Sequence, residues 1–139
     1  MRGLRLLLLT LAMCLALAGC GQVKAPEQGA VSLRLDGAAA EGGSIEPGKG
    51  GLRVYITLNG APLIDLPFGE AHTITVSQPG IGENTVAMTE EAVFMESADC
   101  DGQDCVQMGE VTAQNLELRV LGGFIVCLPH RLSVEVREP

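Results

Sequence analysis

Apolar and polar residues alternate in short runs along most of the chain after its first fifty residues. Residues 52–58 read L-R-V-Y-I-T-L, with an apolar side chain at every second position, which is typical of a half-buried β-strand. Asn59-Gly60 follows and leads into a second run at 61–66. Because both residues tolerate positive φ, Asn-Gly between two such runs predicts a tight hairpin.

Further runs of this kind continue to the C-terminus, and no window of ten or more residues after residue 20 has strong helical periodicity. One helical turn is expected near residues 103–109. Short strands separated by close turns predict an all-β fold, a small β-barrel or sandwich of about six to eight short strands. Besides the first hairpin, we expect strands at 72–76, 85–88, 92–96, 116–120, 124–128 and 132–136.

The N-terminus has a different pattern. Arg2 and Arg5 precede an almost unbroken apolar stretch at 6–17, and the run Leu-Ala-Gly-Cys ends at Cys20. A charged start, a short apolar stretch and a small-residue site predict an export signal. The stretch is shorter than the roughly 20 apolar residues of a membrane span. The site resembles the lipobox of bacterial lipoproteins, which implies cleavage before Cys20 and attachment of lipid, such as palmitate, to its thiol.

The chain therefore divides into three predicted parts. Residues 1–19 are a lipoprotein signal peptide, and residues 20–51 are a lipidated cysteine followed by a flexible tether. This tether contains an alternating run at 31–35, expected to be an outlying strand, and a glycine-rich loop at 37–51. Residues 52–139 form the β domain. The predicted location is the cell envelope, lipid-anchored and facing outside the cytoplasm.

Charge and aromatic content exclude one class of partner. Without the signal, 7 basic and 17 acidic residues remain, so the formal charge is near −10. The chain has no Trp, and its aromatic residues are Tyr55, Phe68, Phe94 and Phe124. Nucleic-acid binding needs a basic surface and, for single strands, aromatic faces for stacking. We therefore expect no nucleic-acid partner.

Three cysteines remain when Cys20 is assigned to lipid and Cys14 is lost with the signal. They lie in two sequence segments. S-A-D-C-D-G-Q-D-C-V contains Cys100 and Cys105, and I-V-C-L-P-H contains Cys127 and His130. This order of motifs, together with R-V-Y-I-T-L-N-G near residue 52, resembles the NusG domain II-like family of exported bacterial proteins. The resemblance covers about 85 residues and implies a compact β-barrel or sandwich in an exported, lipid-anchored protein.

Two features depart from that family pattern. Asp101 stands where the family usually has Pro, and the segment at 109–123 is longer than expected, so 116–120 is predicted to be an added strand or an extended hairpin. The family takes its name from an inserted domain of a transcription factor. The RNA-polymerase-binding part of that factor has no counterpart here, and the resemblance implies no established activity.

The residues leave four interpretations of Cys100, Cys105 and Cys127 open. In the first, two of them form a structural disulfide, with three pairings to choose from. In the second, they bind zinc together with His130 as a Cys3His set. In the third, they form a redox-active pair with a resolving thiol, although the acidic residues around them do not favour a thiolate. In the fourth, they are buried thiols that act as small apolar residues.

No catalytic motif accompanies these residues: G-x-S-x-G, a phosphate loop and H-E-x-x-H are all absent from the sequence. The leading hypothesis is a membrane-anchored, non-enzymatic binding or accessory module whose partner is a membrane or envelope protein, with no cofactor. The alternative is a redox or metal-handling lipoprotein that uses Cys100, Cys105 and Cys127. Neither the partner nor the cysteine pairing follows from the sequence.

Overall fold

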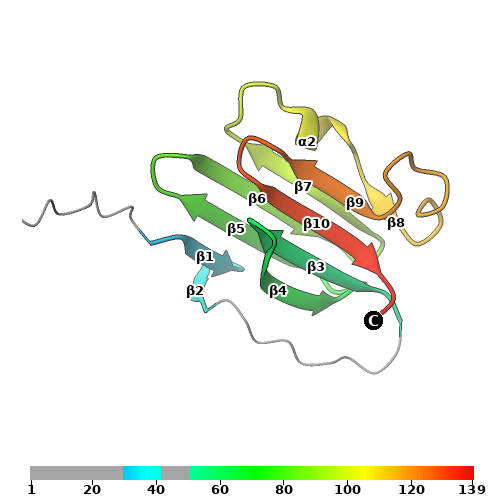
Figure 1. The fold of residues 1–139 in the computed structure, drawn as a ribbon. Coiled ribbons are helices and arrows are strands. Elements are labelled where there is room, and N and C mark those ends of the chain that lie inside the picture. The colour runs from blue at the N-terminus through cyan, green and yellow to red at the C-terminus, as the bar shows by residue number, and fades with distance from the viewer. Residues whose placement is uncertain (1–29, 42–50) are drawn as a thin grey trace, which may run out of the picture.

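The computed structural model describes residues 30–41 and 51–139. The fold is all-β, as predicted. Two antiparallel sheets pack against each other as a sandwich rather than a closed barrel (Figure 1). The described residues contain ten strands: eight of the nine expected ones, counting the outlying strand, and two short strands that were not expected.

The larger sheet has six strands in the order β2-β1-β5-β6-β7-β8. Its central hairpins connect β5 to β6 and β6 to β7, so neighbours in the chain are neighbours in space. The strands are β1 (Ser32–Leu35), β2 (Ala38–Ala40), β5 (His72–Gln78), β6 (Gly82–Met88), β7 (Ala92–Ala98) and β8 (Val111–Thr112).

The smaller sheet has four strands in the order β4-β3-β10-β9. The C-terminal strand β10 therefore lies at its centre and joins two hairpins that are distant in sequence. Asn59 and Gly60, with φ of 53° and 78°, form the predicted turn between β3 and β4. The strands are β3 (Arg53–Leu58), β4 (Ala61–Pro67), β9 (Phe124–Cys127) and β10 (Leu132–Arg137).

The alternation in the sequence corresponds to one buried and one more exposed face of each sheet. Ile56 and Val134 from the smaller sheet and Ile74 and Val86 from the larger one are fully buried in a single apolar cluster. Burying each such side chain stabilises the fold by about 1.5 to 3 kcal/mol before the entropy cost is counted. This shared core holds the two sheets together.

The strand predicted at 116–120 is wrong, because residues 113–123 form turns. Asn115 accepts the backbone N–H of Thr112 through its side chain, at 2.9 Å. Arg119 donates to the backbone oxygens of Met108 at 2.9 Å and Glu110 at 2.8 Å. These side-chain bonds give the segment an alternative to a strand ladder.

Two short strands were not predicted. β2 lies inside the stretch expected to be a loop and pairs with β1 through a turn at Asp36-Gly37. β8 has only two residues and pairs with Ala92 and Val93 of β7. Neither is long enough to show alternation.

The predicted signal at 1–19 and Cys20 lie outside the described residues. Across 30–41 and 51–139, the structure contains no helix with the length and apolarity needed to traverse a membrane. Its one helix in these ranges, α2 (Asp104–Gln107), is a single turn at the position predicted for one.

Candidate functional site

The fold brings together the three cysteines that the sequence singled out. Their sulfur atoms all lie within 4.8 Å of one another, and the Sγ atoms of Cys100 and Cys105 are 3.7 Å apart. All three residues are buried, with Cys105 and Cys127 each 1% exposed. Among the described residues, this is the one group of His, Cys, Asp or Glu side chains compact enough to hold a metal ion.

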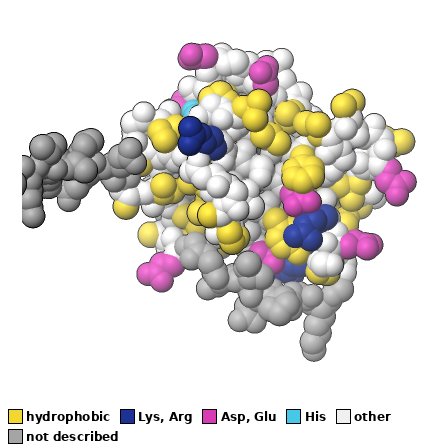
Figure 2. All heavy atoms as spheres, viewed as in Figure 1, with side chains coloured by type: hydrophobic (Ala, Val, Ile, Leu, Met, Phe, Trp, Pro, Cys, Tyr) yellow, Lys and Arg dark blue, Asp and Glu magenta, His cyan; other side chains and the backbone are white. Residues whose placement is uncertain are grey.

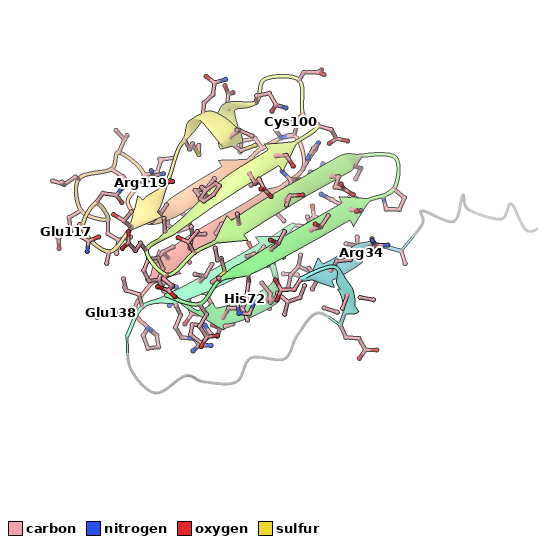
Figure 3. All side chains as sticks on the ribbon, turned by 180° about the vertical axis from the view of Figure 1, so that it is seen from behind. Arg34, His72, Cys100, Glu117, Arg119 and Glu138 are labelled. Carbon is pink, nitrogen blue, oxygen red and sulfur yellow. The ribbon has the colours of Figure 1, made fainter. Side chains whose placement is uncertain are left out.

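Each cysteine comes from a different element. Cys100 follows the end of β7, Cys105 lies in α2, and Cys127 is the last residue of β9 (Figure 3 labels Cys100). The helix packs on both β7 and β9, so it closes the corner between the two sheets. We call the three cysteines the sulfur corner.

Gln103 fixes the loop between the first two cysteines. Its backbone has φ of 54° immediately before α2, and its side-chain amide donates to the carbonyl oxygens of Ala98 at 2.5 Å and Cys100 at 2.7 Å. These bonds tie the start of the helix to the end of β7. The thiol of Cys105 is thereby held against that of Cys100.

The three cysteines are free thiols in this structure. A disulfide needs an S–S distance of about 2.05 Å, which is shorter than the 3.7 Å between Cys100 and Cys105. Burial, with further contributions from the thiols of Cys100 and Cys127, raises the pKa of Cys105 to about 12. Cys105 is therefore protonated at neutral pH and is a poor nucleophile.

His130, proposed from the sequence as a fourth metal ligand, is not part of the sulfur corner. It is buried, and its Nδ1 lies 2.7 Å from Oδ1 of Asn84. Its Nε2 faces Asp99 Oδ1 at 3.4 Å. The ring packs so closely on the backbone of Gly82 that a Cβ there would lie 2.3 Å from Nε2. The turn after Cys127 therefore directs the imidazole toward β6 and away from the sulfurs.

A cavity of about 310 Å³ opens onto the sulfur corner. Its wall combines the three cysteines with Met108, Leu121, Val126, Leu128 and Pro129, and with Gly102, Gln103 and Asp104 at the start of α2. Its lining is mainly apolar and contains sulfur from four side chains. Such a cavity suits an apolar or thiophilic ligand better than a charged organic one.

Exposed apolar side chains surround the mouth of this cavity. Leu118 is 84% exposed, Val120 is fully exposed, Leu128 is 79% exposed and Leu121 is 48% exposed. A second hollow shares Met108 and Leu121 with the cavity and adds Leu118, Arg119 and Val120, so the apolar group is continuous, with one arginine within it. We call these four residues the apolar rim. In Figure 2 hydrophobic side chains gather over the region that Figure 1 labels α2, β8 and β9.

Sequence reasoning missed the rim residues and Asn84. Leu118 and Val120 were assigned to a strand, where one face of the alternation would have been buried, so their exposure was not anticipated. Asn84 had a usable signal, because it occupies the same face of β6 as Val86 and Met88. A polar residue at an inward position indicates a buried hydrogen-bond partner, and that partner is His130.

Comparisons with known proteins agree with this fold. Residues 44–139 match the family model for NusG domain II. The search of curated proteins found no match.

Several solved structures match this fold, including the following two. The Lin0431 protein of Listeria innocua has a TM-score of 0.53 and 24% identity, over 62% of this chain and 94% of that one. A DUF1312 family protein of Enterococcus faecalis has a TM-score of 0.53 and 14% identity, over 63% of this chain and 97% of that one. The family match covers strands β3 to β10, including the sulfur corner and the rim, and begins after β1 and β2. The chain therefore belongs to the NusG domain II family.

Proposed function

We propose that this protein is a lipoprotein anchored through Cys20 outside the cytoplasm, where it works as a non-enzymatic module that binds a membrane or envelope protein. The observation that carries the proposal is the apolar rim. Four of the seven large apolar side chains that are exposed among the described residues gather at this one corner. An exposed apolar group next to a hollow is typical of a protein-binding surface.

The charges of the domain support a protein partner over a lipid surface. The formal charge of the chain is −8, and Glu110 and Glu117 are exposed in and beside the segment that carries the rim. Negative charge of this kind is repelled by anionic membrane surfaces. A partner with an apolar patch bordered by Lys or Arg would complement the rim.

The rim can be tested by site-specific photocrosslinking in intact cells. A photoreactive amino acid at Val120 should crosslink one membrane or envelope protein, and the yield should fall at least fivefold when Leu118→Ser is added. The matched control is a probe at Ile81, which is 60% exposed in the turn between β5 and β6. Equal crosslinking from both positions, or none from Val120, would contradict the proposal.

The anchor is tested in the same cells. With Cys20→Ala, we expect cells grown with labelled palmitate to leave the protein unlabelled, because the substitution removes the thiol that would carry the lipid. Equal labelling of the substituted and unsubstituted proteins would contradict the lipoprotein assignment, and would leave the result on the rim unaffected.

A second candidate function is the handling of a thiophilic metal, which the sulfur corner favours. Redox catalysis is less well supported, because burial and the neighbouring thiols both raise the pKa of Cys105, and nothing in its surroundings lowers it. In an oxidising envelope the competing state is a disulfide, and Cys100 and Cys105, whose sulfur atoms are 3.7 Å apart, are one pair that could form it.

A further inference from the structure

We propose that Cys100, Cys105 and Cys127 bind one monovalent copper ion, Cu(I), through three sulfur atoms. This inference rests on the second candidate function and is independent of the apolar rim. It differs from the zinc set expected from the sequence in both the ion and the number of ligands.

The spacing of the sulfurs suits a single ion without rearrangement of the backbone. Metal–sulfur bonds are about 2.3 Å long, so three sulfurs around one ion lie roughly 3.8 to 4.0 Å apart. The observed separation of Cys100 and Cys105 is 3.7 Å, and all three sulfurs lie within 4.8 Å of one another. A change of side-chain rotamer that moves the third sulfur by no more than about 1 Å would bring it into range.

The site is held in this shape before any ion arrives. Two of its ligands lie at the ends of strands β7 and β9, and the third lies on α2, which Gln103 ties to the end of β7. A site whose ligands sit on rigid elements loses little entropy when it binds.

The donor set discriminates between ions. Structural zinc sites almost always have four ligands, and the compact group here contains three sulfurs with no carboxylate or imidazole among the described residues. His130 is hydrogen-bonded to Asn84. Soft thiolate and thioether ligands suit Cu(I), an ion that is stable with three donors.

The cavity provides a route to the site and further sulfur. It reaches all three thiols, and the thioether of Met108 lines the same wall, where Sδ accepts the N–H of Val126 at 3.3 Å. An ion delivered by a small thiol or another protein could therefore exchange onto the three cysteines through a mostly apolar opening.

Binding involves protons but no electron transfer. Each thiol that coordinates Cu(I) releases its proton to solvent, so a complex with three thiolates releases three protons and carries a net charge of −2 at the site. Affinity should consequently rise with pH. The number of protons released sets the slope of this dependence, so three coordinating thiols give a steeper one than two.

The test is a titration of the full chain, purified anaerobically in detergent with reduced thiols, using Cu(I) in competition with a coloured Cu(I) chelator. We expect one ion per chain, three sulfur neighbours by X-ray absorption, and tighter binding at pH 8 than at pH 6. Cys100→Ala, Cys105→Ala and Cys127→Ala should each weaken binding at least tenfold. Val126→Ala, which trims the same cavity without removing a ligand, should stay within twofold of the unsubstituted chain.

Three outcomes would overturn the proposal: no Cu(I) bound, tighter retention of Zn²⁺ than of Cu(I) in a parallel titration, or a disulfide among the three cysteines in chain isolated from anaerobic cells. The same titration in a Cys14→Ser/Cys20→Ser background must give the same stoichiometry. This arm separates the site from the lipid anchor, so failure of one does not imply failure of the other.

Discussion

Cys127 and His130 are three residues apart and equally buried, yet they belong to two regions with opposite chemistry. The imidazole of His130 joins a polar region in which Asn84 bonds its ring and the Gln78 side chain donates to its carbonyl oxygen at 2.8 Å. The thiol of Cys127 joins the sulfur corner. Among the described residues, every buried side-chain nitrogen and oxygen has a hydrogen-bond partner.

The two regions differ in whether their polar and sulfur atoms already have a strong partner within the protein. Buried polar atoms stabilise the fold only when they are paired, and an unpaired one costs about 1 to 3 kcal/mol. Thiols form weak hydrogen bonds and are tolerated in a core as small apolar groups. The polar groups around His130 therefore have their hydrogen bonds within the protein, whereas the sulfur atoms of the sulfur corner can still coordinate a metal ion.

The largest expected effect comes from breaking the polar region. Asn84→Ala should lower the free energy of unfolding by about 3 kcal/mol, because it removes a fully buried side chain and leaves Nδ1 of His130 without its partner. Chemical denaturation measures this change. Thr85→Ala, on the other face of β6, is the control and should cost less than half as much; equal losses would mean that the Asn84–His130 pair has no special role.

A smaller effect is expected in the sulfur corner. Cys105→Ala should lower the free energy of unfolding of the metal-free, reduced protein by about 1 to 2 kcal/mol, since it removes one buried apolar-like atom and breaks no strong hydrogen bond. The same denaturation assay under reducing conditions checks this. If Cys105→Ala lowers the free energy of unfolding as much as Asn84→Ala does, the thiols contribute as much to stability as the polar region.

The smallest effect is expected at the other histidine, which begins the central strand β5 at the end of the larger sheet away from Cys100 (Figure 3). His72 Nδ1 is 2.8 Å from Asp36 Oδ2, and this hydrogen bond is the main cause that raises the pKa of His72. It is also the main cause that lowers the pKa of Asp36. The pair is at the surface, where such interactions contribute little.

The sign of the pH effect follows from these two shifts. The contribution of His72 is fully present below its unfolded pKa of about 6.5 and is lost as the pH rises through its higher folded value. That of Asp36 is lost as the pH falls through its lowered folded value. The stability difference between the unsubstituted chain and His72→Gln should therefore peak near pH 5 to 6 and vanish in alkaline solution. Asp36→Asn should reduce that pH dependence and leave the smaller part due to Glu70, which lies 3.4 Å from Nε2 of His72; a difference that grows above neutral pH would contradict the assignment.

Much of the fold followed from alternation, because sheets with one buried face impose a period of two on the sequence. The same rule failed at 116–120, where Leu116, Leu118 and Val120 alternate without being in a strand. There the side-chain bonds of Asn115 and Arg119 to the backbone outweigh the pattern, and no rule of periodicity contains them.

The candidate site was predictable in part. The cysteine motifs singled out Cys100, Cys105 and Cys127 as a candidate thiol cluster with four possible roles, and the structure shows that their sulfur atoms lie together. The motifs could not indicate where the ring of His130 points. Its direction depends on a turn in which Arg131 has φ of 53° and on Asn84, which is 46 residues away in sequence. The backbone conformation of this turn and the hydrogen bond between Asn84 and His130 both depend on how the two sheets pack.

The strand order of the larger sheet determines how far the start of the described chain lies from the sulfur corner. The described chain begins beside β1, near one edge, and the sulfur corner lies at the end of β7, three strands further across, which is roughly 14 Å at the usual spacing of strands. The register pairs Ser32 with Ser77, Ser77 with Glu83 and the neighbouring Asn84 with Ala98, so the start of β1 and the sulfur corner lie at the same end of the strands. A domain tethered to a bilayer through the residues before β1 would therefore hold the sulfur corner close to its point of attachment, and the length of the tether would set how far that corner can move from the lipid.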